Sequence, residues 1–283
     1  MSRRARLAFA GAAISAGLLV LIWALATQLA VGQHGDQAIL KGFLDLGRPR
    51  VNSVAAFIAR LCDPMPWIYF AAIPIVIGLA RRRPRVALAI LVILVGANAS
   101  AQLLKPLLAA PRAHGLLGNL PHISAASWPS GHATAAMSLA VASVLAAPAR
   151  WRGAVAAAGA AFAVAVSYSF LTLGWHYPSD VLGGFLLAGT WALAVVGTLF
   201  WLDARRDWQA AAPAIRRPSL RHSLRPAGLA LAAGLCLAGV VGLVRPHEVM
   251  AYSRSHAALV VGAPAIAVLG LLVATAVSFA FRR

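Results

Sequence analysis

Long apolar segments constrain this chain more than any other feature of its sequence. They occupy residues of about 7–31, 66–80, 86–108, 131–147, 154–174, 181–202, 227–244 and 257–280. Most of them approach the roughly 20 residues that a helix needs to cross a bilayer. Backbone polar groups in lipid must pair within their own segment, which excludes open strands. We therefore predict an all-α fold, a polytopic membrane helical bundle with about eight spans.

The composition agrees with a membrane location. The chain is 61% hydrophobic and 11% charged, whereas a soluble domain carries roughly 25% charged residues. A net charge of +18 would suit nucleic acid, but the arginines fall in short clusters between the apolar runs. We expect membrane lipids as partners and no nucleic acid, and the sequence leaves the oligomeric state open.

The distribution of basic residues predicts the orientation. If the N-terminus is cytoplasmic and the spans alternate, about two thirds of the 25 basic residues lie on the inner side. Both termini are then cytoplasmic, in a bacterial-type inner (plasma) membrane. The first apolar run is too long for a typical signal peptide, so we expect an uncleaved first span.

Three segments between or after the spans have distinct compositions. Residues 33–60 mix charged and apolar side chains, which predicts an amphipathic segment in the outer interface before the chain turns inward near Asp63-Pro64. Residues 203–226 contain three prolines and six arginines and are expected to form a basic cytoplasmic linker. Residues 227–283 then form an appended transmembrane hairpin. The two cysteines are far apart, and no metal site or cofactor is expected.

A polar tetrad, Pro129-Ser130-Gly131-His132, stands at the start of one apolar segment. Ser130 can cap the helix that follows, and Gly131 allows the backbone to approach a ligand closely. The unpaired first amides of that helix, with its dipole, favour a bound phosphate. His132 would face the same anion and could donate a proton. Taken alone, the tetrad fits an ordinary helix start with an interfacial histidine equally well.

Two basic residues end another apolar segment. Lys105 lies at its outer end, and Arg112 follows seven residues later. A lysine at that depth can simply extend its charge to the interface. Arg112 offers a planar fork that can hold two phosphate oxygens, which a lysine cannot match.

A histidine and an aspartate form the third cluster, at the start of the sixth span. His176 and Asp180 are four residues apart, close enough for the carboxylate to accept a ring N–H across one helical turn. This contact fixes the tautomer and leaves the other ring nitrogen free as a nucleophile. The alternative is a pair that only caps the helix. The neighbouring Trp175 and Tyr177 are expected to be interface anchors.

The order of these clusters resembles the type 2 phosphatidic acid phosphatase superfamily of membrane lipid phosphatases. The family patterns are Lys, six residues, Arg-Pro; Pro-Ser-Gly-His; and Ser-Arg, five residues, His, three residues, Asp. Here the first runs from Lys105 to Arg112-Ala113, and the third is Ser169-Phe170 followed by His176 and Asp180. Ala113 thus replaces a proline, and Phe170 replaces an arginine.

The resemblance implies a six-span lipid phosphatase core over residues 1–202. It assigns catalysis to His176, His132 and Asp180, with His176 forming a phosphohistidine, and it involves no metal. The phosphate-binding residues that it implies are Lys105, Arg112, Ser130 and Gly131. Compensation for Phe170 is expected, if anywhere, from basic side chains nearby; the candidates are Arg245, Arg254, His114 and His122.

The expected function is hydrolysis of a phosphomonoester or diphosphate of a lipid on the outer leaflet. Undecaprenyl diphosphate, phosphatidylglycerol phosphate and phosphatidic acid all fit as the lipid phosphate substrate, and the first is slightly favoured because the site faces outward. One alternative is a lipid phosphotransferase. Another is a catalytically weakened protein that binds lipid phosphates. A transporter is disfavoured because no inverted repeat is visible.

Overall fold

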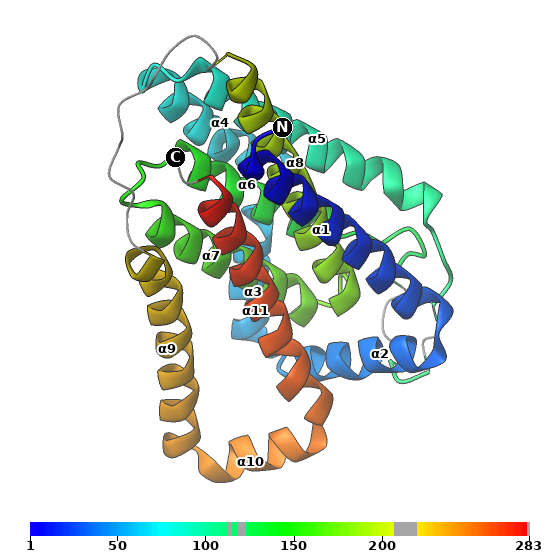
Figure 1. Cartoon of the computed structure of the whole chain (residues 1–283). Coiled ribbons are helices and arrows are strands. Elements are labelled where there is room, and N and C mark those ends of the chain that lie inside the picture. Colours follow the sequence, from blue (N-terminus) through cyan, green and yellow to red (C-terminus); the bar gives the residue numbers. More distant parts are fainter. Residues whose placement is uncertain (113–114, 118–122, 207–219, 282–283) are drawn as a thin grey trace.

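The computed structural model describes residues 1–112, 115–117, 123–206 and 220–281 (Figure 1). Within these ranges the chain forms eleven α-helices and no strand, which confirms the all-α prediction. In chain order the helices are α1 Arg3–Gln28, α2 Ala30–Asp45, α3 Pro49–Arg60, α4 Pro64–Ala80, α5 Pro84–Leu107, α6 Gly131–Ala146, α7 Arg152–Thr172, α8 Pro178–Arg206, α9 Leu220–Val244, α10 Pro246–Ser255 and α11 Ala257–Ala280.

Prolines mark where several helices begin. The first positions of α3, α4, α5 and α10 are occupied by Pro49, Pro64, Pro84 and Pro246. A proline at this position already has the φ angle of a helix, and the N–H that it lacks would have no partner within the helix. The apolar runs between these starts then continue as helices because lipid offers their backbone no other partner.

Six described helices are long and apolar enough to cross a membrane, namely α1, α5, α7, α8, α9 and α11. They coincide with six of the predicted spans by length and composition. A seventh candidate is the pair α3 and α4, which is bent by 53° between residues 60 and 64. The predicted span at 131–147 is the apolar helix α6, with 16 residues. Its length of about 24 Å falls short of the roughly 30 Å hydrocarbon core.

Helix α6 is short because it lies inside the protein rather than against lipid. It packs on α4, α5, α7, α8 and α11, and most of its side chains are buried. A helix shielded on all sides need not cover the whole bilayer. Its N-terminus can therefore lie below the level of the surrounding helix ends.

Helices α2 and α10 lie across the end of the bundle opposite to the two termini (Figure 1). Of the predicted interfacial segment 33–60, α2 lies across this end and α3 packs along α7. The interfacial position of the segment stays a prediction. The shared end of the termini fits an even number of crossings, while the cytoplasmic assignment stays a prediction.

The C-terminal hairpin packs directly on the rest of the bundle. Helix α11 contacts α7, α8 and α2, and α9 contacts α7. Of the predicted linker 203–226, residues 203–206 belong to the end of α8 and residues 220–226 to the start of α9. The separation of a core from an appended hairpin stays a prediction.

The crossing of α6 and α8 depends on Gly184. A Cβ atom there would lie 2.8 Å from the Ala133 Cβ, 2.9 Å from the Ser130 carbonyl oxygen and 2.9 Å from the Thr134 amide nitrogen. Two of these neighbours are backbone atoms, so the helices must move apart. We expect Gly184→Ala to destabilise the protein by about 1–3 kcal/mol, measured as a lower midpoint of thermal unfolding in detergent.

The matched control is Gly17→Ala in α1, where an added Cβ meets nothing within 4 Å. That variant should unfold at or slightly above the wild-type temperature because alanine favours a helix. Equal midpoints for the two variants would show that the α6–α8 crossing tolerates a larger separation.

Candidate active site

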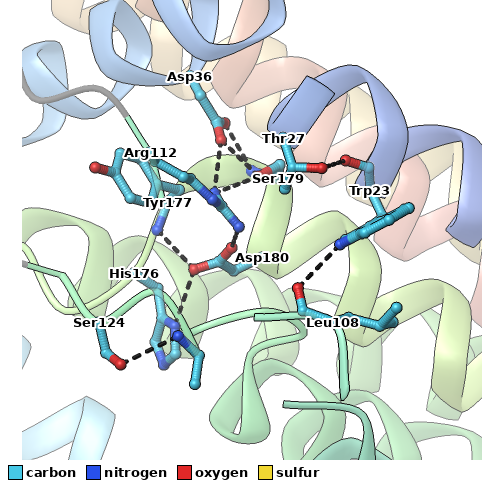
Figure 2. Close-up of polar contacts among 11 residues, drawn as sticks. Trp23, Thr27, Asp36, Leu108, Arg112, Ser124, His176, Tyr177, Ser179 and Asp180 are labelled. Carbon is cyan, nitrogen blue, oxygen red and sulfur yellow. Dashed lines mark hydrogen bonds and ion pairs between the residues drawn. The ribbon is translucent and has the colours of Figure 1, made fainter. Parts of the chain in front are cut away.

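The centre of the site is the side chain of Arg112, which follows α5 and is buried between α2 and α8. Its Nη1 lies 3.1 Å from the Asp36 carboxylate and 3.0 Å from the Ser179 hydroxyl, and its Nη2 lies 2.5 Å from Asp180 (Figure 2). The exposed fractions of the three charged side chains are 4%, 7% and 0%. Buried charges of this kind persist only when they are paired and hydrogen-bonded.

Arg112 also rests on an aromatic ring, and α1 helps to anchor the start of its segment. The guanidinium carbon lies 4.6 Å from the centroid of the Tyr177 ring. Just after α5, the indole N–H of Trp23 donates to the Leu108 carbonyl at 3.1 Å (Figure 2). Tyr177 is buried, so the expectation that it anchors the chain at the interface was wrong. Burial raises the pKa of Tyr177 to about 12, although the Arg112 guanidinium lowers it.

Asp180 joins Arg112 to His176. One carboxylate oxygen of Asp180 accepts a hydrogen bond from the Arg112 guanidinium. The other oxygen lies 3.2 Å from His176 Nδ1 and accepts the Tyr177 N–H at 3.1 Å. A carboxylate at this distance holds a proton on Nδ1, which leaves Nε2 of His176 with its lone pair. The contact between His176 and Asp180 that their spacing predicted is therefore present.

The start of α6 lies directly beside this pair. Ser130 is fully buried, and its hydroxyl accepts the Ala133 N–H as the predicted helix cap. Its own amide donates to the Asp180 carbonyl at 2.9 Å, which ties α6 to the first turn of α8. A Cβ on Gly131 would lie 3.5 Å from Lys105 Nζ and 3.2 Å from Gln102 Nε2. The ammonium of Lys105 therefore stands at the positive end of α6.

The second histidine, His132, faces the first. The two rings are 6.4 Å apart between centroids, and His132 Nε2 lies 3.0 Å from the Asp63 carboxylate. Asp63 precedes α4, so the bend between α3 and α4 sets this contact. Trp175 is partly exposed, with its ring centroid 5.9 Å from that of His132.

Phe170 packs beside both histidine rings. It is fully buried, and its ring centroid lies 5.2 Å from that of His176 and 6.0 Å from that of His132. The side chain that replaces an arginine thus points into the site. Of the proposed substitutes, Arg245 and Arg254 interact with Glu248 and Met250 within α10 itself. His114 and His122 lie outside the described residues.

The structure brings the seven predicted site residues together at one end of the bundle, but it also contains polar partners that the sequence did not indicate. Asp36, Asp63 and Gln102 were not predicted. Arg112 was expected to present its fork to phosphate, yet both of its Nη atoms bind carboxylates. Its Nε is buried and has no hydrogen-bond partner among the described residues. The Nε–H of the arginine is therefore available to a ligand.

Asp36 lies on α2, outside the predicted spans, and its carboxyl group is buried. Burial raises the pKa of its carboxyl to about 6, although the Arg112 guanidinium and the hydrogen bonds from Ser179 lower it. Among the described residues, no group of three His, Cys, Asp or Glu side chains could hold a metal ion. Metal independence itself stays a prediction.

These features define a multi-pass membrane protein with a His–Asp pair beside a capped, cation-flanked helix start. Residues 17–204, more than half of the chain, match the family model of the PAP2 superfamily. The chain therefore belongs to the PAP2 superfamily, as its motif order predicted. Membership in this family supports a membrane phosphatase.

A solved structure shows the same fold. It is described as the first transmembrane PAP2 type phosphatidylglycerolphosphate phosphatase from Bacillus subtilis. The TM-score is 0.56 and the sequences are 24% identical, over 69% of this chain and 98% of that chain. No curated protein matches the sequence significantly.

The buried position of Arg112 has a consequence for stability. Replacing it with methionine would leave Asp36 and Asp180 buried without their common counter-ion. We expect Arg112→Met to lower the free energy of unfolding by about 3–5 kcal/mol, measured by thermal unfolding in detergent.

The control for this prediction is Arg245→Met. Arg245 forms a pair with Glu248 in which both side chains are largely exposed, and such pairs contribute about 0–1 kcal/mol. A similar loss in both variants would mean that the charge network around Arg112 adds nothing beyond a surface ion pair.

Proposed function

We propose that this protein is a membrane lipid phosphatase that hydrolyses a phosphomonoester or diphosphate of a lipid through a phosphohistidine. The observation that carries the proposal is the position of His176. Buried Asp180 holds its Nδ1 at 3.2 Å, and the capped start of α6 with Lys105 stands next to it. A nucleophile, an orienting carboxylate and an anion site thus occur together.

In the first step, His176 Nε2 attacks phosphorus and the bond from phosphorus to the leaving oxygen breaks. His132 gives its proton to that oxygen, using the ring nitrogen that Asp63 does not hold. The Asp63 carboxylate lies 3.0 Å from Nε2 and orients the His132 ring for the transfer. In the second step, His132 removes a proton from water, and the water oxygen displaces His176 from phosphorus. Phosphate leaves and both histidines return to their starting state.

The charge on the phosphoryl oxygens needs fixed positive partners. The proposed ones are Lys105, the Ser130 hydroxyl, the Gly131 amide at the start of α6, and the Nε–H of Arg112, which has no other partner among the described residues. Phosphoryl transfer depends mostly on positioning and on such charge stabilisation. In this proposal the reaction requires no metal ion.

The substrate tail would remain in the bilayer while the headgroup reaches the histidines. An open groove of about 390 Å³ runs between α3 and α7, lined by Val54, Ile58, Tyr168 and Ser169 among others. Undecaprenyl diphosphate, phosphatidylglycerol phosphate and phosphatidic acid are the proposed substrates. The site lies at the end opposite to the termini, which supports action on the outer leaflet.

The direct test is phosphate release from these three lipids by purified protein in detergent, with and without chelator. We expect release from at least one lipid in both conditions, and no release by His176→Ala. His247→Ala is the control, because that histidine is exposed on α10. Phosphate release that survives in His176→Ala would exclude the phosphohistidine route. Labelled product analysis with an added acceptor lipid would reveal a phosphotransferase.

A second candidate function is binding of a lipid phosphate without turnover. Phe170 favours it, because the site lacks one cation of the family pattern and Arg112 is already paired with two carboxylates. This function predicts that the lipids bind to the wild-type protein while no phosphate is released from any of them.

Phe170→Arg separates the two functions. The new guanidinium would lie beside both histidine rings, near the phosphoryl group that His176 attacks in the proposed mechanism. A charge-assisted hydrogen bond contributes about 1.5–3 kcal/mol, so we expect kcat/KM to rise by about one to two powers of ten.

The control is Phe170→Leu, which removes the ring without adding charge and should not raise kcat/KM. A fall in activity for Phe170→Arg, with an unchanged unfolding temperature, would mean that the site already has its full set of cations.

A further inference from the structure

Asp36 on α2 forms hydrogen bonds with two residues of the candidate site, Arg112 and Ser179. Its Oδ1 accepts the Ser179 N–H at 2.8 Å, and its Oδ2 accepts the Ser179 hydroxyl at 2.5 Å and Arg112 Nη1 at 3.1 Å. Ser179 lies in the first turn of α8, where a negative charge stabilises the helix dipole. One carboxylate thus caps the helix that carries Asp180 and also holds the arginine that binds Asp180.

The contacts form one continuous chain from α2 to the proposed nucleophile. Asp36 binds Arg112, Arg112 binds Asp180, and Asp180 binds His176 Nδ1 (Figure 2). Every link except His176 is at most 7% exposed, so water competes weakly for these bonds. If Asp36 lost its charge, Arg112 could turn toward Asp180 alone, and the Asp180 oxygens would no longer be held for His176.

Helix α2 is itself held by the C-terminal hairpin. The Tyr252 hydroxyl donates to the Gly42 carbonyl at 2.5 Å, and His256 Nε2 lies 2.8 Å from the Asp45 carboxylate. Gly42 also packs so closely on Leu259 that a Cβ would lie 2.8 Å from the leucine Cβ. Asp36 therefore belongs to a helix with a defined position, as a positioning residue must.

We propose that Asp36 is a positioning residue of this active site, which holds Arg112 so that Asp180 keeps His176 in its reactive tautomer. The proposal rests on the phosphatase function put forward above. Asp36 touches neither histidine and acts only through Arg112 and Ser179. Its loss should therefore lower kcat more than it raises KM.

The ionisation of Asp36 should make the effect of its replacement on kcat depend on pH. A purely structural role would not produce this pH dependence. The charged and titratable groups facing Asp36 are Arg112, Asp180 and Tyr177. Because burial raises the pKa of Asp36 to about 6, the wild-type residue is charged above this pH and gains a proton as the pH falls through it. An asparagine imitates the protonated state at every pH. The ratio of wild-type to Asp36→Asn kcat should therefore fall toward one below about pH 6.

The experiment compares the wild type with Asp36→Asn, using His34→Asn as the control, because His34 is exposed on the same helix. At pH 7.5 we expect Asp36→Asn to lose about tenfold to hundredfold in kcat, the range caused by small misplacements of catalytic groups. His34→Asn should keep the wild-type kcat. In parallel, NMR of protein with ¹⁵N-labelled histidine should show one Nδ1–H tautomer of His176 in the wild type and a mixture in Asp36→Asn.

The two readouts separate the possible failures. An unchanged kcat and an unchanged His176 signal in Asp36→Asn would overturn the positioning role, as would a loss of kcat that is independent of pH. If the wild type releases phosphate from no lipid, the proposed function fails, and the His176 signal alone decides the role of Asp36. If Asp36→Asn does not fold, Asp36→Glu replaces it, since it keeps the buried charge but moves the carboxylate from its position against Arg112 and Ser179. An unchanged His176 signal in that variant would also overturn the proposal.

Discussion

The arrangement of the site depends on one buried cation. The guanidinium of Arg112 is held between Asp36 and Asp180, and these two carboxylates belong to helices far apart in the sequence. Removal of a charge from water is costly and is offset only when several hydrogen bonds satisfy it. The contacts that satisfy Arg112 also fix α2 against the start of α8, and the start of α8 against α6. Local electrostatics and helix packing are therefore parts of the same constraint.

The short helix α6 explains how such a polar site can exist in a membrane protein. A helix that spans lipid must carry its apolar surface across the whole hydrocarbon layer. Helix α6 is enclosed by other helices, so it can begin below their ends, and Ser130 is fully buried at its start. Unpaired amides and Lys105 then lie in a shielded environment. Charge interactions are stronger there than at an exposed helix end.

Hydropathy predicted most of the fold, and residue spacing predicted most of the site. Spans are visible in sequence because lipid requires about 20 apolar residues in succession, and His176 and Asp180 are visible because they share one helical turn. Asp36 was not visible, because it lies 76 positions before Arg112 and is one of several charges in an amphipathic segment. The partners of Arg112 depend on how α2 crosses the bundle, which no local pattern encodes.

The C-terminal hairpin holds the helix that carries Asp36, and this contact connects the hairpin to the site. Tyr252 and His256 bind α2 at Gly42 and Asp45, on the side of the helix toward its C-terminus, whereas Asp36 lies more than one turn earlier. A rigid helix transmits a displacement along its length. If the hairpin shifted, the carboxylate of Asp36 would shift with it, and Arg112 would lose one of its two counter-ions. The hairpin is thus connected to His176 by the same buried charges that hold the bundle end together.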